Sequence, residues 1–361
     1  MSRAIGARAA RILAVATVVI GSLSGAVAKA DTVKEFSQPN VIGIAGTNGA
    51  LWFATPTLIG RLDSSGRLLA SYKLPAGVSI INAAPGEPFP TGADGSMWFS
   101  AVRHKGHRLI GLIGHVSVSG NVEFLRALPR GHGGPVLTRD THGNFWFSDH
   151  VVRHHSRFVA VGELTPSGRL RDFRLPGDAD VVGLSPGPGK QIWFTSCSLQ
   201  GSSAYVGWVD SRGHIKIFSP HGPWCPGDIV AGPDGAMWFT AALDQLGPHQ
   251  DQIGRITPSG TVTYYSTGTA TVEPDGITVG PDGALWFTEH SAPAIARMTT
   301  DGKWSQVMLP RSSEPTQIVL GPNNAVWFLD QQTSGYPVDP SARLGVVTGG
   351  TPSPIDSLPQ P

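Results

Sequence analysis

The chain has little of what usually marks the common functional classes. Only 15% of its 361 residues are charged, and 27 Lys and Arg are balanced by 26 Asp and Glu. No strong charge of either sign therefore points to nucleic acid or to an anionic membrane surface. Gly-x-Ser-x-Gly, P-loop and zinc-protease motifs are also missing, so the local sequence supports none of those three mechanisms.

Helical periodicity is absent too, except at the start of the chain. Arg3, Arg8 and Arg11 precede a mostly apolar stretch, Ile12 to Val27, and Ala28-Lys29-Ala30 then offers small residues for cleavage. This order predicts a signal peptide over residues 1–30. An uncleaved membrane anchor is the alternative, but the apolar run is short for a span and is interrupted by Gly and Ser.

Export would set the character of the mature chain. Cleavage after residue 30 removes four basic and no acidic residues, which leaves 23 Lys and Arg against 26 Asp and Glu, a formal charge of −3. No cysteine follows the cleavage site, so a lipid anchor is not expected. We expect an exported protein, periplasmic or secreted, with no membrane span in the mature chain and no nucleic-acid partner.

What the sequence does contain is one repeat. A Trp-Phe pair occurs seven times, at spacings of 46, 48, 47, 45, 48 and 41 residues. The tryptophans are Trp52, Trp98, Trp146, Trp193, Trp238, Trp286 and Trp327. A period of about 40–50 residues indicates an array of small structural units.

Each unit reads as four short strands. In the sixth unit, Ile277 to Val279 is a β-branched strand, Gly280 to Gly283 is a tight turn, and Ala284 to Thr288 returns with the Trp-Phe pair. An apolar residue followed by Gly or Ala marks a third strand, and a fourth strand ends near a proline. The predicted fold class is therefore all-β, a seven-bladed β-propeller with four-stranded antiparallel blades over residues 31–350.

The two ends of the chain predict how the ring closes. Residues Thr32 to Pro39 resemble a fourth strand but precede the first Trp-Phe pair. Leu344 to Thr348 is a third strand, and only a Pro-rich tail, residues 351–361, follows it. We expect the N-terminal strand to complete blade seven, because closure of the ring removes two exposed sheet edges.

The repeat also predicts where packing and binding residues lie. The Trp-Phe pairs should fill the wedge between neighbouring blades. Loops that enter the first strand and leave the second share one rim, where ligand-facing residues should lie. Cys197 and Cys225, the only cysteines, lie on this rim in adjacent blades. We expect a disulfide between them, with two free thiols as the alternative.

Blade six collects acidic residues at the same rim. Glu273 enters its first strand, and Asp275 follows two residues later. Glu289 and His290 leave its second strand. Convergent carboxylates suit a hard divalent cation such as Mg²⁺, which takes oxygen ligands and keeps waters. Solvated loop residues or strand caps are the alternative interpretation.

Three segments resemble the virginiamycin B lyase family, propellers that inactivate streptogramin antibiotics. They are Glu273 to Ile277, Gly280 to Glu289 and Ile253 to Thr257, and the resemblance of the repeats extends over residues 32–348. The resemblance implies a seven-bladed, Mg²⁺-dependent monomer that linearises cyclic depsipeptides by elimination and gives antibiotic resistance. It also implies that Glu273 and Glu289 match the metal ligands of the family.

The histidine base of that family has no counterpart here. The family pattern is Glu-Pro-His-Gly-Ile, and this chain has Asp275 at the histidine position. A second family histidine corresponds to Gly227, which is followed by Asp228, and we expect these two residues to contact substrate. An unperturbed Asp has a pKa of about 3.9, too low to remove an α-proton readily unless burial raises it. We expect Asp275 to act as a base or a third metal ligand, with His290 as the alternative base.

The function expected from all of this is the Mg²⁺-dependent elimination or ring opening of a cyclic peptide ester. The ligand would be a small molecule or cyclic peptide at the propeller rim, and the replacement of the family histidine by Asp275 argues against streptogramins themselves. A non-catalytic propeller that binds a protein or a glycan is one alternative. A lactonase-like hydrolase, which rests on fold analogy alone, is the other.

Overall fold

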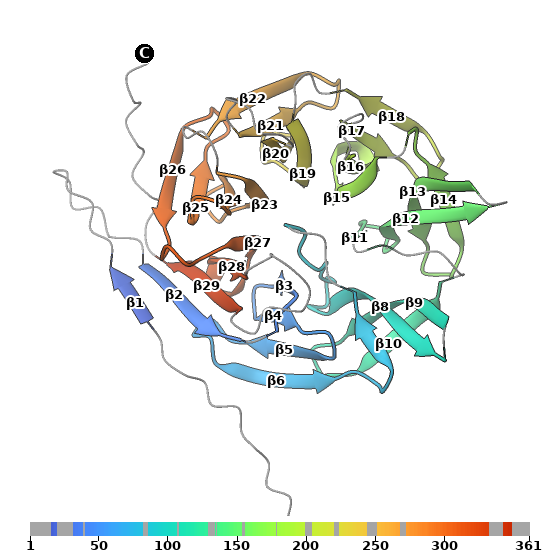
Figure 1. Cartoon of the computed structure of the whole chain (residues 1–361), viewed down its shortest axis with the longest axis horizontal. Coiled ribbons are helices and arrows are strands. Elements are labelled where there is room, and N and C mark those ends of the chain that lie inside the picture. Colours follow the sequence, from blue (N-terminus) through green and yellow to red (C-terminus); the bar gives the residue numbers. More distant parts are fainter. Residues whose placement is uncertain are drawn as a thin grey trace, which may run out of the picture.

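A computed structural model describes most of the chain between residues 16 and 348. The described residues are 16–19, 32–38, 40–81, 86–106, 108–128, 134, 136–153, 156–177, 179–198, 204–219, 224–243, 251–267, 272–331 and 342–348. They form seven antiparallel sheets arranged as a ring (Figure 1), as predicted for a seven-bladed propeller. Within these ranges no helix is long and apolar enough to cross a membrane.

The first three blades follow one another along the chain. Blade one contains β3 (Gly43–Gly46), β4 (Leu51–Ala54), β5 (Leu58–Leu62) and β6 (Leu68–Lys73). Blade two contains β7 (Val78–Ile80), β8 (Met97–Lys105), β9 (Arg108–Val116) and β10 (Val122–Ala127). Blade three contains β11 (Leu137–Arg139), β12 (Phe145–Arg153), β13 (Ser156–Leu164) and β14 (Leu170–Arg174).

The next three blades repeat the pattern. Two short 3-10 turns lie between the first and second strands of blades four and seven, η1 (Pro188–Lys190) and η2 (Pro322–Asn324). Blade four contains β15 (Asp180–Pro186), β16 (Ile192–Cys197), β17 (Ala204–Val209) and β18 (Ile215–Phe218). Blade five contains β19 (Trp224–Ala231), β20 (Met237–Leu243), β21 (Gln252–Ile256) and β22 (Val262–Ser266). Blade six contains β23 (Pro274–Val279), β24 (Leu285–Glu289), β25 (Ala294–Met298) and β26 (Trp304–Met308).

Blade seven joins the two ends of the chain, which confirms the predicted closure. Its strands β27 (Pro315–Leu320), β28 (Val326–Asp330) and β29 (Arg343–Thr348) are completed by β2 (Thr32–Ser37). The pairing of β2 with β29 runs from Thr32 opposite Thr348 to Ser37 opposite Arg343. A further strand, β1 (Ala16–Val19), pairs with the outer edge of β2.

The predicted leader and tail lie almost wholly outside the described residues. Of residues 1–30 only β1 is described, and the tail at 351–361 is not. The signal peptide and its cleavage therefore stay predictions.

Each Trp-Phe pair packs in the wedge between two blades. In six of the blades the phenylalanine lies directly opposite a glycine of the third strand, as Phe99 does opposite Gly114 and Phe194 opposite Gly207, and in blade six Phe287 lies opposite Ala296. A Cβ at Gly114 would come within 2.8 Å of the Phe99 ring, so the missing side chain makes room for the ring. The tryptophan faces the next blade, and the Trp52 indole donates a hydrogen bond of 3.0 Å to the Gly95 carbonyl of blade two. Packing of the blades therefore explains both residue types of the repeat.

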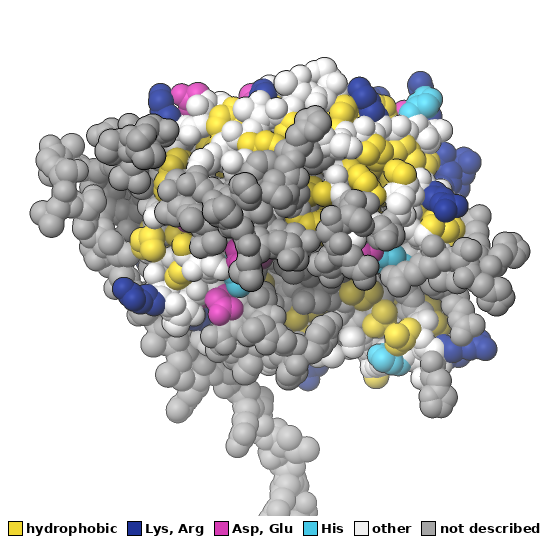
Figure 2. Space-filling model, turned by 45° about the horizontal axis from the view of Figure 1, so that its top comes forward, with side chains coloured by type: hydrophobic (Ala, Val, Ile, Leu, Met, Phe, Trp, Pro, Cys, Tyr) yellow, Lys and Arg dark blue, Asp and Glu magenta, His cyan; other side chains and the backbone are white. Residues whose placement is uncertain are grey.

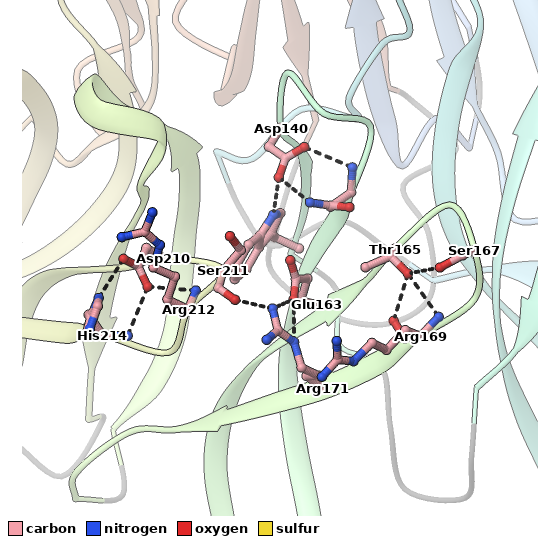
Figure 3. Close-up of polar contacts among 12 residues, drawn as sticks. Asp140, Glu163, Thr165, Ser167, Arg169, Arg171, Asp210, Ser211, Arg212 and His214 are labelled. Atoms are coloured by element: carbon pink, nitrogen blue, oxygen red, sulfur yellow. Dashed lines mark hydrogen bonds and ion pairs between the residues drawn. The ribbon is translucent and has the colours of Figure 1, made fainter.

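Within each blade, short polar turns join strand one to strand two and strand three to strand four. They lie at the rim opposite to the loops between strands two and three, and Figure 3 shows those of blade three. Asp140 accepts hydrogen bonds from the Trp146 indole at 3.0 Å and from Asn144. Arg171 joins Glu163 of its own blade to the Ser211 carbonyl of the next blade. Asp140 thus fixes a turn within blade three, and Arg171 ties blade three to blade four at this rim.

A substitution of Phe36, on the N-terminal strand β2, tests how much the closure of the ring contributes to stability. The Phe36 ring is buried against Trp327 of the same blade, with centroids 5.9 Å apart, and it packs with blade one. Phe36→Ala should cost about 3–5 kcal/mol of the free energy of unfolding, because it leaves a cavity at the only joint made by the chain ends. Calorimetry should show a clearly lower melting temperature, whereas the exposed Lys34→Ala on the same strand should change it little; equal effects would contradict this role.

Candidate functional site

The inner strand of blade two is interrupted near the ring axis. Strand β7 pairs with Ala101–Arg103 of β8, and the pairing resumes only at Thr91, opposite Met97. The chain between these points includes the described residues 86–90, which we call the central insert. In Figure 1 the blue-green chain of blade two comes close to the centre of the ring.

The central insert touches blades one and six, which lie on either side of blade seven. The Phe89 N–H donates a hydrogen bond of 2.8 Å to the Ile44 carbonyl of blade one. Gly86 lies against blade six, where a Cβ added to it would be 2.8 Å from the Asp275 carbonyl oxygen. Gly86 has φ +83, a conformation that only glycine adopts readily, so it can make this backbone-to-backbone approach.

Glu87 of the central insert reaches blades four and five. Its side chain is buried, and its Oε1 accepts a hydrogen bond of 3.0 Å from the Leu184 N–H. Glu87 also shares a hydrogen bond with the Asp228 carboxyl. The Asp228 carboxyl in turn accepts hydrogen bonds from the Ile229 N–H at 2.7 Å and from the Ile277 N–H of blade six at 2.9 Å.

Burial controls the protonation of this pair. It raises the pKa of Asp228 to about 7 and raises the pKa of Glu87 well above its ordinary value, because an ion loses its hydration there. The neighbouring Asp228 charge raises the pKa of Glu87 further. A hydrogen bond between two carboxyl groups needs a proton, so at neutral pH the pair holds one.

Backbone bulges at the start of the inner strands place the acidic residues. The register shifts between Val181 and Gly183, Pro226 and Ile229, Pro274 and Ile277, and Pro315 and Ile318. In the last three of these bulges, the threonine that follows the Trp-Phe pair of the preceding blade donates its hydroxyl to a backbone carbonyl of the bulge. Thr195 donates to Gly227, Thr240 to Asp275 and Thr288 to Thr316. Bulges are common next to active sites, because the extra residue changes the direction in which a side chain points.

Glu289 is the least satisfied acid of blade six. Its side chain is fully buried at the end of β24, and neither carboxyl oxygen has a hydrogen-bond partner among the residues that the structure describes. Burial raises its pKa to about 8. A buried carboxyl group without partners is costly, so its position fits a cation that would supply the missing interaction.

Asp275 lies in the bulge of blade six, close to Asp228. Its side chain is half-buried, and its pKa is raised to about 8 by burial first and then by the charges of Asp228 and Glu273. Its carbonyl accepts the Thr240 hydroxyl at 3.1 Å. Asp275 is therefore held in place through its backbone.

Glu273 lies at the outer end of the same strand and is more exposed. Its backbone has φ +48, and its N–H donates a hydrogen bond of 2.8 Å to the buried Asp251 carboxylate. The Glu273 carboxylate accepts a hydrogen bond from the Ser291 hydroxyl and lies 3.4 Å from His290 Nδ1. His290 Nε2 is 3.5 Å from the Glu314 carboxylate of blade seven.

The structure brings the predicted blade-six residues to one end of the blade. Pro274 pairs with Glu289, and the His290 N–H donates to the Glu273 carbonyl at 3.1 Å. Among the described residues, however, no group of three or more His, Cys, Asp or Glu side chains is arranged to hold a metal ion. A site made by Glu273, Asp275 and Glu289 together stays a prediction.

In Figure 2, Lys and Arg side chains lie mostly toward the edge of the face in view, and some acidic and histidine side chains lie nearer its middle.

The two residues expected to contact substrate lie in blade five. Gly227 packs on Thr240, and its carbonyl accepts the Thr195 hydroxyl. Both Asp228 oxygens already accept backbone N–H groups, so the structure gives Asp228 a role in holding blade six beside blade five. Contact of either residue with a substrate stays a prediction.

The structure also joins Cys197 of β16 to Cys225 of β19 in a disulfide, with the two Cα atoms 5.5 Å apart. The bridge links blades four and five, three residues before Asp228.

Sequence reasoning missed Glu87 and Asp251. Glu87 lies in a Pro- and Gly-rich stretch, Ala84 to Pro90, where blade two should have its first strand. That departure from the repeat was the available signal of an insertion. Asp251 follows a loop of variable length, and nothing in its local sequence distinguishes it.

The fold and the site define an all-β propeller with buried carboxyl groups at the rim of one blade. The sequence model of the Virginiamycin B lyase family matches residues 91–336, and the chain belongs to this family. A search of curated proteins finds no match.

Solved structures share the fold over most of the chain. A streptogramin B lyase structure has 25% identity and a TM-score of 0.67, and the match covers 89% of this chain and 98% of that one. Virginiamycin B lyase from Staphylococcus aureus has 23% identity and a TM-score of 0.67, with 88% and 99% covered. A catalytically inactive variant of the S. aureus enzyme with quinupristin has 23% identity and a TM-score of 0.66, with 88% and 99% covered.

The Glu87–Asp228 pair predicts a pH-dependent stability. The unfolded chain releases both protons near pH 4, whereas the folded chain keeps at least one to about pH 7, so stability should fall as pH rises through this window. Glu87→Gln keeps an acceptor for Leu184 and offers an N–H to Asp228, so it should reduce that fall by on the order of 1 kcal/mol.

Melting temperatures measured between pH 5 and 8 test this. The curve of Glu87→Gln should be flatter than that of the unsubstituted protein, and the exposed Glu123→Gln of the same blade should match the unsubstituted curve. Asp275 is the other carboxyl group whose charge interacts with Asp228, and it is unchanged in all three proteins. Parallel curves for all three would show that the pair does not titrate as described.

Proposed function

We propose that this protein is a divalent-cation-dependent lyase that opens a cyclic ester, such as a cyclic depsipeptide, by elimination at the rim of blade six. The observation that carries the proposal is the buried Glu289 carboxyl group, whose oxygens have no hydrogen-bond partner among the described residues. Mg²⁺ binds through one or two carboxylates and keeps several waters, so a cluster of three protein ligands is not required.

Glu289 and Glu273 would hold the cation from the two sides of the β23–β24 pair. A bound Mg²⁺ would supply Lewis-acid polarisation of a substrate carbonyl group. Asp251 supports Glu273 by accepting its N–H, and Ser291 donates to its carboxylate. These contacts orient Glu273 without using both of its oxygens.

Asp275 is the proton acceptor that we assign, because it occupies the base position of the family motif beside Glu273 and Glu289. In the elimination, the C–H bond α to the carbonyl breaks and its proton passes to the Asp275 carboxylate. The electron pair forms a carbon–carbon double bond, and the ester C–O bond breaks so that the oxygen leaves as a carboxylate. His290, held between Glu273 and Glu314, is the alternative acceptor.

Membership of the Virginiamycin B lyase family supports this chemistry. We also propose that the protein is exported and acts as a monomer. The leader-like residues 1–30 and the Cys197–Cys225 disulfide support export, since disulfides persist in oxidising compartments.

A non-catalytic binding propeller is the second candidate. Gly227 and Asp275 stand where the family pattern has histidines, and this difference favours loss of the proton-transfer chemistry with retention of the fold. A ligand would then bind at the same rim without reaction.

Incubation with Mg²⁺ and a series of cyclic depsipeptides, of which a type B streptogramin is one, tests the enzyme. We expect the ring of at least one of them to open with no change in mass, because elimination adds no water, whereas a lactonase-like hydrolase would add one water. EDTA should stop the reaction, and Glu289→Gln should lower kcat/KM by about 100-fold or more, because it removes a charge that the cation needs. Mass spectrometry follows the product.

Glu123→Gln is the control and should retain full activity. A melting temperature that rises with Mg²⁺ in the unsubstituted protein, but not in Glu289→Gln, would locate the cation independently of turnover. No turnover together with no Mg²⁺-dependent shift would favour the binding propeller.

A further inference from the structure

We propose that the central insert, residues 86–90, forms one wall of the blade-six site and sets the size of the ligand that reaches Asp275, with Glu87 as its positioning residue. The relevance to a ligand rests on the function proposed above. The arrangement of the insert rests only on contacts in the fold.

The insert is held at both ends of its path across the ring. Phe89 is fixed on blade one through the Ile44 carbonyl, and Gly86 lies in backbone contact with blade six. Glu87, between them, reaches Leu184 and Asp228. Blades one, four, five and six are therefore joined by a segment that belongs to blade two.

Blade six is shaped to receive the insert. The bulges of blades five and seven carry Asp228 and Gln317, whose side chains accept the Ile277 and Ile44 N–H groups of the following blades. The corresponding residue of blade six is Gly276. A Cβ there would lie 2.6 Å from the Thr316 carbonyl oxygen and 3.0 Å from that of Gly86, so blade seven and the insert together fill the space that a side chain at this position would take.

Glu87 keeps the insert in place by accepting a hydrogen bond that a shorter residue could not reach. The Leu184 N–H is buried, and without the Glu87 carboxyl it would lose its acceptor. An unsatisfied buried donor is costly, so truncation of Glu87 should release the insert or admit water. Glutamine has the same length and retains an acceptor, so it should preserve the position.

This arrangement limits the approach to Asp275. A Cβ built on Gly86 would lie 2.8 Å from the Asp275 carbonyl oxygen and 3.1 Å from its Oδ1, so the insert occupies one side of Asp275 and a ligand would approach from another side. Asp275 would then contact only the part of a ligand that extends past Glu273. The insert would exclude ligand groups too large for the space between it and blade six. Glu87 acts in this through position, without touching the ligand.

The accessibility of position 275 tests the proposal without any metal or substrate. The chain has no free cysteine, since Cys197 and Cys225 are bonded, so Asp275→Cys introduces the only free thiol. Its reaction with a small methanethiosulfonate and with a bulky polymer-linked maleimide is measured in three further backgrounds: Glu87→Ala, Glu87→Gln and the control Glu123→Ala.

We expect Glu87→Ala to raise the rate of the bulky reagent by about tenfold or more, with a smaller effect on the small reagent, because a wall has been loosened. Glu87→Gln and Glu123→Ala should leave both rates unchanged. Equal bulky-reagent rates in folded Glu87→Ala and in the Glu87 parent would overturn the proposal. If Glu87→Ala does not fold, Phe89→Ala, which loosens the other end of the insert, should raise the rate, and no rise would overturn the proposal.

The two proposals fail in different ways. Altered labelling in Glu87→Ala without turnover of any cyclic depsipeptide in the series would support the insert and count against the lyase. Turnover with unchanged labelling would support the lyase and count against the insert.

Discussion

The close packing of a phenylalanine ring over a third-strand glycine is the interaction on which the fold depends. It occurs in six blades, from Phe53 over Gly60 to Phe328 over Gly345, and blade six has Ala296 at the glycine position. The adjoining tryptophan fills the wedge to the next blade. Because every blade relies on its neighbours, no blade can bury its aromatic residues alone, and the ring has to close. The N-terminal strand β2 meets that requirement.

At the inner ends of the blades, by contrast, backbone polar groups have to find hydrogen-bond partners. Strand bulges free backbone N–H groups, and buried carboxyl and amide groups accept them, as Asp228 accepts Ile277 and Gln317 accepts Ile44. Paired or protonated acids are thus part of the scaffold in blades two and five. Glu289 differs, since neither of its oxygens has a hydrogen-bond partner within the described chain. That contrast separates acids that hold the fold together from an acid that is available to a ligand.

Much of the architecture could be predicted from local pattern. The Trp-Phe period gave the number of blades, turn residues gave the strand limits, and the pattern at Thr32 to Pro39 predicted closure of the ring. In the site, the sequence predicted that Glu273, Asp275, Glu289 and His290 lie at one end of blade six. It could not show that Glu289 is buried, that His290 lies between Glu273 and Glu314, or that Asp251 caps Glu273, because these depend on how separate strands and loops meet.

The sequence by itself determined a ring of seven four-stranded units and the blade in which acidic residues gather, because both follow from residue types at fixed spacing. Only the tertiary structure decided that Glu87 reaches the Leu184 N–H, 97 residues away, and shares a proton with Asp228. No local pattern encodes such a contact, since the residues meet only when the ring brings the inner ends of blades two, four and five together. The protonation of the buried acids follows from the same closure, because burial in the assembled ring removes the water that would stabilise their charges.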